Sequence, residues 1–142
     1  MKLGLIKLFL RMAIAAAFLS AVADRFGWWA PEISVWGTWE NFLSYTQMIN
    51  PWIPLSMIPA VGWIATIAEI VLAILLIVGF KTSFAAKCSG ILLLLFAMAM
   101  VFSTGIKGAL DYSVFTAAAA AFALSVMHEK FLELDSLLTK KN

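Results

Sequence analysis

Apolar residues along the chain gather in four runs, separated by stretches that carry polar residues, proline or glycine. The runs cover residues 5–23, 60–80, 84–102 and 113–127, and the last is shorter than the others but extendable at both ends. An α-helix of about 20 apolar residues is long enough to cross the hydrocarbon core of a bilayer. The pattern therefore predicts an all-α fold, an integral membrane four-helix bundle, in a single domain over residues 1–142.

The composition agrees with this class of protein. Of the 142 residues, 63% are hydrophobic and 13% are charged, whereas a soluble domain has roughly 45–50% apolar residues. The mean hydropathy is +0.97. The net charge of +2 and the scattered basic residues exclude a nucleic-acid partner. Four spans leave no room for a separate soluble enzyme domain.

The basic residues predict the orientation of the bundle. Eight of the ten basic residues fall on one side of the predicted spans: Lys2, Lys7, Arg11, Lys81, Lys87, Lys130, Lys140 and Lys141. Only Arg25 and Lys107 fall on the other. By the positive-inside rule, both termini are expected in the cytoplasm. The long first connection, residues 24–59, then faces outward from a bacterial inner membrane.

The N-terminal stretch has a second interpretation. Residues 1–23 combine a basic start, an apolar run and Ala21-Val22-Ala23, which resembles a signal-peptidase site. Cleavage there would leave three spans. Arg11 shortens the apolar core expected of a signal peptide, so retention as a first span is favoured.

The outward connection is rich in aromatic residues. It holds five of the six tryptophans: Trp28, Trp29, Trp36, Trp39 and Trp52. Such rings favour the membrane–water interface. Residues 38–50 predict a short amphipathic helix with Thr38 as its N-cap, and Pro59 is expected to open the next helix. The connection is interpreted either as an interfacial anchor or as a lid, carrying Trp28 and Trp39, over a site between the helices.

Glu69 is the polar residue that the apolar pattern does not explain. It precedes Lys81 by twelve residues, about 18 Å of helix, which places it near the middle of its span. A charged residue there costs about 2.5–3.5 kcal/mol, so Glu69 should face the bundle and have a partner. Thr66 lies one turn away on the same face. Arg11 is the expected partner, although its side chain also has the length to reach the headgroups. The pair is interpreted as structural or as a ligand, quinone or proton site.

Other polar positions suggest a mouth at the outward side. Asp24, Arg25 and Asp111 are expected to gather there, with Asp111 as N-cap of the fourth helix. With one cysteine and one histidine, the chain lacks a metal-binding motif and an internal disulfide. No motif assigns a catalytic residue.

Several stretches resemble the DoxX family of small four-helix membrane proteins. The resemblance rests on Arg11, "FLSAVADRFGWW", "NPWIP", "AEIVLAILLIVGFKTSFAA" and "DYSVF". The family commonly has Thr-Arg after its Gly-Phe or Gly-Leu pair, and this chain departs from that pattern at Lys81-Thr82-Ser83. The departure bears on loop charge.

The resemblance implies a function in membrane redox chemistry. Some relatives are small subunits of a thiosulfate:quinone oxidoreductase, and others are associated with thiol or quinone stress. The implied function is an accessory subunit of a quinone-linked membrane redox system, at most a subunit of an enzyme, with quinone as a non-covalent cofactor. The partners expected are the lipid bilayer, a membrane redox partner and a second copy of the chain. A proton-coupled exporter and a membrane assembly protein are the alternatives.

Overall fold

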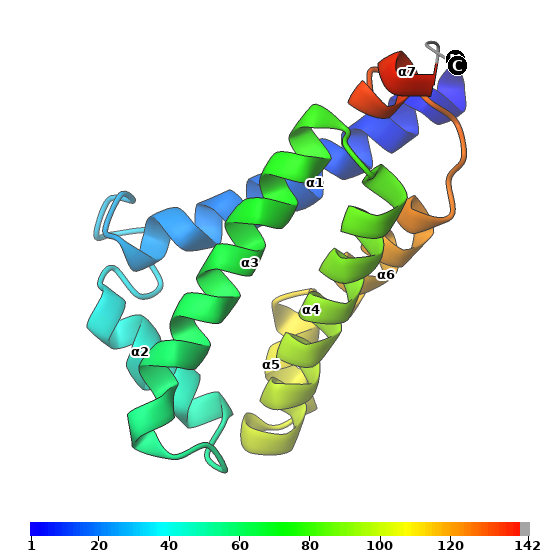
Figure 1. Ribbon diagram of the computed structural model, residues 1–142. Helices are drawn as coiled ribbons and strands as arrows, with labels where there is room; N and C mark the ends of the chain where they lie inside the picture. Colours follow the sequence, from blue (N-terminus) through cyan, green and yellow to red (C-terminus); the bar gives the residue numbers. More distant parts are fainter. Residues whose placement is uncertain (140–142) are drawn as a thin grey trace.

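The computed structural model describes residues 1–139, and the regular secondary structure in that range is helical, with no strand. Figure 1 shows the order of the elements. They are α1 (Lys2–Arg25), α2 (Trp39–Ile49), the 3-10 turn η1 (Leu55–Met57), α3 (Ile58–Val78), α4 (Thr82–Thr104), α5 (Ile106–Asp111), α6 (Val114–Ser125) and α7 (Leu134–Thr139).

Three helices of the described chain are long and apolar enough to cross a membrane: α1, α3 together with η1, and α4. They match the first three predicted spans to within a few residues. The fourth predicted span is different, because α6 has only 12 residues, or about 18 Å of helix. Ser113, with a φ of 55°, separates it from α5. Asp111 therefore ends α5, and its prediction as N-cap of the last apolar helix is wrong.

The long helices pack in pairs. In Figure 1, α1 runs obliquely across α3, while α3 and α4 are joined by a short turn. α1 packs mainly on α3, and α4 mainly on α6. Fully buried alanines lie at the centre of this packing: Ala73, Ala85, Ala86 and Ala121. Their small side chains let the helices approach closely, which favours association of helices in a membrane.

Gly79 ends α3 and makes the turn into α4 possible. Its φ of 69° is left-handed, and its N–H donates to the Leu75 carbonyl. A Cβ atom at this position would lie 2.6 Å from Nη2 of Arg11 and 2.7 Å from Cα of Glu133. Glycine is therefore required both by the backbone conformation and by two close neighbours.

α2 covers one end of the long helices, here called the α2 end. The predicted N-cap is confirmed, because the Thr38 side chain accepts a hydrogen bond from the Asn41 N–H at 3.2 Å. Gly62 of α3 allows close packing, since a Cβ atom there would meet Leu43 of α2 at 2.7 Å. Buried Ile49 also packs α2 into a cluster formed by α4 and α5.

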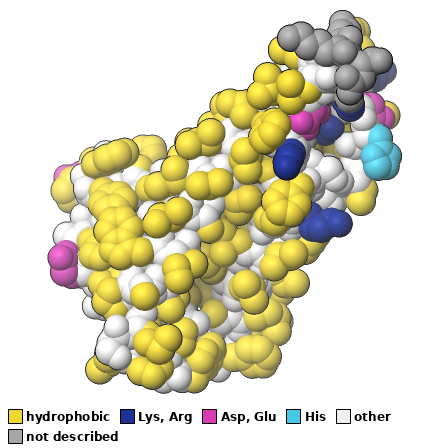
Figure 2. All heavy atoms as spheres, in the orientation of Figure 1, with side chains coloured by type: hydrophobic (Ala, Val, Ile, Leu, Met, Phe, Trp, Pro, Cys, Tyr) yellow, Lys and Arg dark blue, Asp and Glu magenta, His cyan; other side chains and the backbone are white. Residues whose placement is uncertain are grey.

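The opposite end, here called the α7 end, collects charged groups. α1 begins there, and α7 lies beside that start of α1 (Figure 1). In the face seen in Figure 2, the middle of the molecule is covered by hydrophobic side chains, whereas the basic side chains and the histidine gather toward the α7 end. On this face the long helices are therefore apolar, and the basic residues lie at one end of them.

Candidate functional site

A buried ion pair joins α1 to α3 near the α2 end. Nη2 of Arg25 donates to Oε1 of Glu69 at 2.8 Å, and Nη1 lies 2.6 Å from Oε2. Nη1 also donates to Oγ1 of Thr66 at 2.7 Å. Arg25 is 3% exposed and Glu69 is 2% exposed. The carboxylate therefore has a partner that neutralises its charge inside the fold, as burial of a charge requires.

The predicted partner of Glu69 was wrong. Arg11 is fully buried but lies beside the last turn of α3, where Nε and Nη2 donate to the carbonyls of Leu76 and Ile77 at 2.8 and 2.9 Å. The last carbonyls of a helix lack intrahelical donors and attract a cation. The last carbonyls of α3 therefore accept hydrogen bonds from the Arg11 guanidinium, about two helical turns away from Glu69. The oblique path of α1 brings Arg25 to the acid in its place.

Two aromatic rings, here called the aromatic cover, lie over the Arg25 guanidinium. The Phe42 ring centroid is 4.1 Å from Cζ of Arg25, and the Trp36 centroid is 5.5 Å away. The two rings meet edge to face at 5.3 Å. Cations over aromatic faces gain electrostatic energy, and more so when water is excluded. The aromatic cover therefore shields the ion pair and stabilises its cation.

Asp24 fixes the loop that carries Trp36. Its carboxylate accepts a hydrogen bond from Ser34 Oγ and two more from the backbone N–H groups of Val35 and Trp36, each at 3.0 Å. Asp24 and Arg25 are adjacent in sequence and both are buried. Asp24 therefore positions Trp36 of the aromatic cover, while the next residue, Arg25, forms the ion pair beneath it.

A second group of rings lies beside the aromatic cover. Trp39 stacks on Phe26 at 5.6 Å and contacts Trp63 of α3 at 4.5 Å. Trp28, by contrast, is 77% exposed. Of the two tryptophans predicted for a lid, Trp39 lies within the packed aromatic residues and Trp28 lies at their edge.

Tyr45 of α2 is partly buried against the cluster that Ile49 forms with α4 and α5. Its ring lies 5.7 Å from that of Trp36. Burial raises the pKa of the Tyr45 phenol, and Tyr112 contributes a smaller effect in the same direction. The Tyr45 phenol therefore stays uncharged at neutral pH.

Asp111 does not join Asp24 and Arg25. It pairs with Lys107 on the surface of α5, where the two side chains are 58% and 85% exposed. Surface pairs at this spacing contribute little to stability. The cluster predicted at the mouth is therefore formed by Asp24 and Arg25 without Asp111.

Two buried donors at the site have no hydrogen-bond acceptor among the described residues. They are Nε of Arg25 and Nε1 of Trp36. Trp36 also lines an open hollow of about 410 Å³ between the 27–37 loop and the start of α2. Buried donors without an acceptor are unfavourable by about 1–3 kcal/mol each. These two N–H groups are therefore the hydrogen-bond donors of the site that the described residues leave unused.

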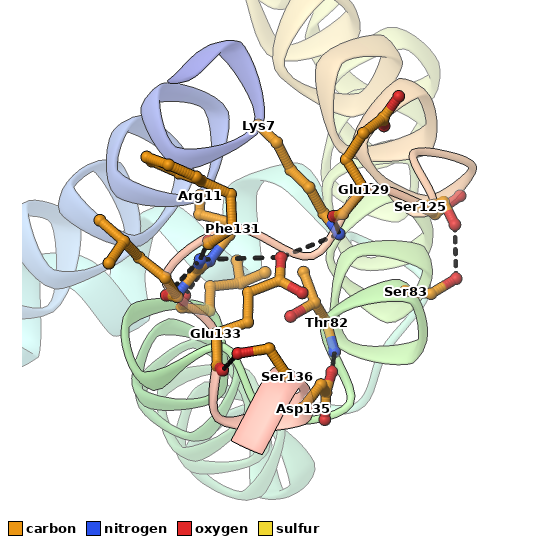
Figure 3. A network of polar contacts seen from close by, with 12 residues as sticks. Lys7, Arg11, Thr82, Ser83, Ser125, Glu129, Phe131, Glu133, Asp135 and Ser136 are labelled. Carbon is orange, nitrogen blue, oxygen red and sulfur yellow. Dashed lines mark hydrogen bonds and ion pairs between the residues drawn. The ribbon is translucent and has the colours of Figure 1, made fainter. Parts of the chain in front are cut away.

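A second polar network closes the α7 end (Figure 3). Lys7 Nζ lies 2.8 Å from Glu133 Oε1 and donates to the Glu129 carbonyl at 2.6 Å. Nη1 of Arg11 donates to the carbonyls of Phe131 and Leu132 at 3.1 and 2.9 Å. The sequence pattern did not point to Glu133, because it lies in a polar tail where an acid is unremarkable.

The described residues contain no cluster of histidine, cysteine, aspartate or glutamate suited to a metal ion. Cys88 is a free thiol, partly buried in α4. Comparison of the chain with protein-family models, curated proteins and solved structures gave no match.

Proposed function

We propose that this chain is a DoxX-like multi-pass protein of a bacterial inner membrane, with both termini in the cytoplasm. The support is the length and apolarity of α1, α3 and α4 and the placement of basic residues toward the α7 end. α5 and α6, both packed on α4, together form the fourth crossing element of the proposed bundle.

At the α2 end, the proposed function is to bind a membrane quinone as an accessory subunit of a redox system. The observation that carries this proposal is the pair of buried donors, Arg25 Nε and Trp36 Nε1, that lack acceptors next to aromatic rings. A quinone is a flat, apolar ring with carbonyl oxygens. Its ring matches the aromatic cover, and its oxygens match the two donors.

The ion pair gives this site its polarity without a mobile proton. Glu69 holds the Arg25 guanidinium in place through Nη1 and Nη2, which leaves Nε directed elsewhere. A carboxylate engaged by both terminal nitrogens of an arginine is poorly suited to the proton exchange that drives an exporter. The site therefore favours binding of a neutral acceptor over proton-coupled export. The electron transfer itself belongs to the redox partner.

The test is quinone binding to the purified full-length protein in lipid nanodiscs. A short-chain quinone is titrated, and binding is followed by calorimetry. The wild type is expected to bind, and Trp36→Phe, which keeps a ring but loses the indole N–H, should bind about tenfold more weakly because one hydrogen bond is worth about 1.4 kcal/mol.

Trp28→Phe is the matched control, because Trp28 is largely exposed and should leave the affinity unchanged. The proposal is contradicted if the folded wild type binds no quinone, or if the two variants lose affinity equally. Thermal unfolding of all three proteins confirms that each is folded.

A further inference from the structure

The C-terminal segment, residues 126–139, covers two deeply buried cations at the α7 end. Lys7 and Arg11 are 3% and 0% exposed, and much of what covers them is contributed by this segment. Glu133 contacts both, at 2.8 Å from Lys7 Nζ and 3.7 Å from Nη1 of Arg11. Figure 3 shows the Glu133 carboxylate between the two basic side chains. An anionic group from the tail of the chain thus occupies a site built by α1.

A second carboxylate of the segment binds nearby. The carboxylate oxygens of Asp135 accept the backbone N–H groups of Lys81 and Thr82, at 2.8 and 3.0 Å, where α4 begins. An anion is favoured at the N-terminus of a helix. The α7 end therefore offers two cations and two backbone donors, and two of the three acids of the segment, Glu133 and Asp135, bind them.

The segment has features of a displaceable element. Leu132, next to Glu133, adopts a φ of 48°, a left-handed conformation that costs roughly 1–2 kcal/mol for a residue with a side chain. Leu132 gains no burial in return, because it is 68% exposed. Leu137 and Leu138 of α7 are also exposed. Detachment would relieve the strained residue and expose little further apolar surface at these positions.

The location of the site indicates which anion competes with Glu133 for the two basic residues. α1 and α4 begin there and α3 ends there, so in the proposed membrane placement the site is level with the lipid headgroups. Phosphates are the most concentrated anions at that level, and anionic lipids lack the ammonium that compensates the phosphate of zwitterionic ones. Exposed leucines of α7 suit the same interface.

We propose that Lys7, Arg11 and the start of α4 form a binding site for the phosphate of an anionic lipid, and that the C-terminal segment occupies it through Glu133 until the lipid displaces it. The inference rests on the membrane placement and is independent of quinone binding. The segment, here called the latch, is then bound in a membrane of zwitterionic lipids and displaced in a membrane that contains anionic lipids.

The test is hydrogen–deuterium exchange of the full chain in nanodiscs, followed by mass spectrometry of residues 126–139. In phosphatidylcholine, the segment should be protected, since Asp135 N–H bonds to the Gly79 carbonyl. Adding phosphatidylglycerol should speed its exchange by about threefold or more as the segment opens. Equal exchange in both lipids would overturn the proposal. So would an equal acceleration by inorganic phosphate in phosphatidylcholine, because the anion would then come from solution.

The substitution Glu133→Gln tests the proposal independently of the lipid. It removes the charge that binds Lys7 and should give fast exchange even in phosphatidylcholine. Glu129→Gln is the matched control, because only the backbone carbonyl of Glu129 contacts Lys7 and its carboxylate points away from the network (Figure 3). If Glu133→Gln exchanges as slowly as this control, the latch is not held by Glu133. Should Glu133→Gln fail to fold, the lipid dependence of the wild type decides by itself.

Discussion

Arg25 and Glu69 are 44 positions apart in sequence, yet the guanidinium meets both oxygens of the carboxylate, at 2.8 and 2.6 Å. The contact ties the last residue of α1 to the middle of α3. Removing one partner of a buried pair leaves an uncompensated charge, which is more costly than the pair itself is favourable. The stability of the fold should therefore depend on both partners being present or both being neutral.

A double-mutant cycle tests this coupling. We expect Glu69→Gln and Arg25→Gln each to destabilise the protein by about 3–5 kcal/mol, and the double variant to cost much less than their sum. Thermal and denaturant unfolding in a mild detergent measure the three changes. Glu69→Gln combined with Arg11→Gln is the comparison. The changes in unfolding free energy of those two substitutions should add. Coupling between them would support the pair of Glu69 with Arg11 that the sequence predicted.

Gly79 should be intolerant of any side chain. Gly79→Ala is expected to lower stability by about 1–2 kcal/mol for the left-handed backbone alone, with a further loss of about 1–3 kcal/mol from the contact with Arg11 and Glu133. Gly108→Ala is the control, because it is helical and its nearest neighbour lies at 3.4 Å. The two variants are compared by the midpoints of their unfolding transitions. Similar midpoints would mean that the turn adapts.

Asp24 should govern the order of the loop before α2. In Asp24→Asn, the loss of charge weakens hydrogen bonds worth about 1.5–3 kcal/mol each to an ionised acceptor. The amides of Val35 and Trp36 should exchange faster with deuterium, because they donate to this carboxylate. Glu32→Gln, on the exposed part of the same loop, should leave exchange unchanged. Slow exchange in both variants would show that the loop is held by its aromatic contacts alone.

The proposed orientation predicts which residues a reagent outside the cell can reach. In a Cys88→Ser background, Glu40→Cys should react with a membrane-impermeant maleimide in intact cells, and His128→Cys only after the cells are opened. Both positions are exposed, so labelling reports their side of the membrane. The opposite result would invert the topology derived from the basic residues.

The sequence by itself determined where the three long helices and α2 lie. The apolar runs predicted α1, α3 and α4 because burying a backbone in an apolar medium requires helices of that length. Thr38 predicted the start of α2, since an N-cap is a local interaction between neighbouring residues. The sequence also showed that Glu69 needs a partner, because an isolated charge within an apolar run is costly.

The tertiary structure decided which residues meet. The position of Arg11 in the first span and the length of its side chain predicted a pair with Glu69. Arg11 instead donates to the free carbonyls at the end of α3, and the oblique crossing of α1 brings Arg25 to the acid. Glu133 carried no local signal, because its partners are more than 120 residues away in the chain. Local interactions set the helices, whereas the crossing angle of helices and the return of the C-terminal segment set the long-range ion pairs of residues 1–139.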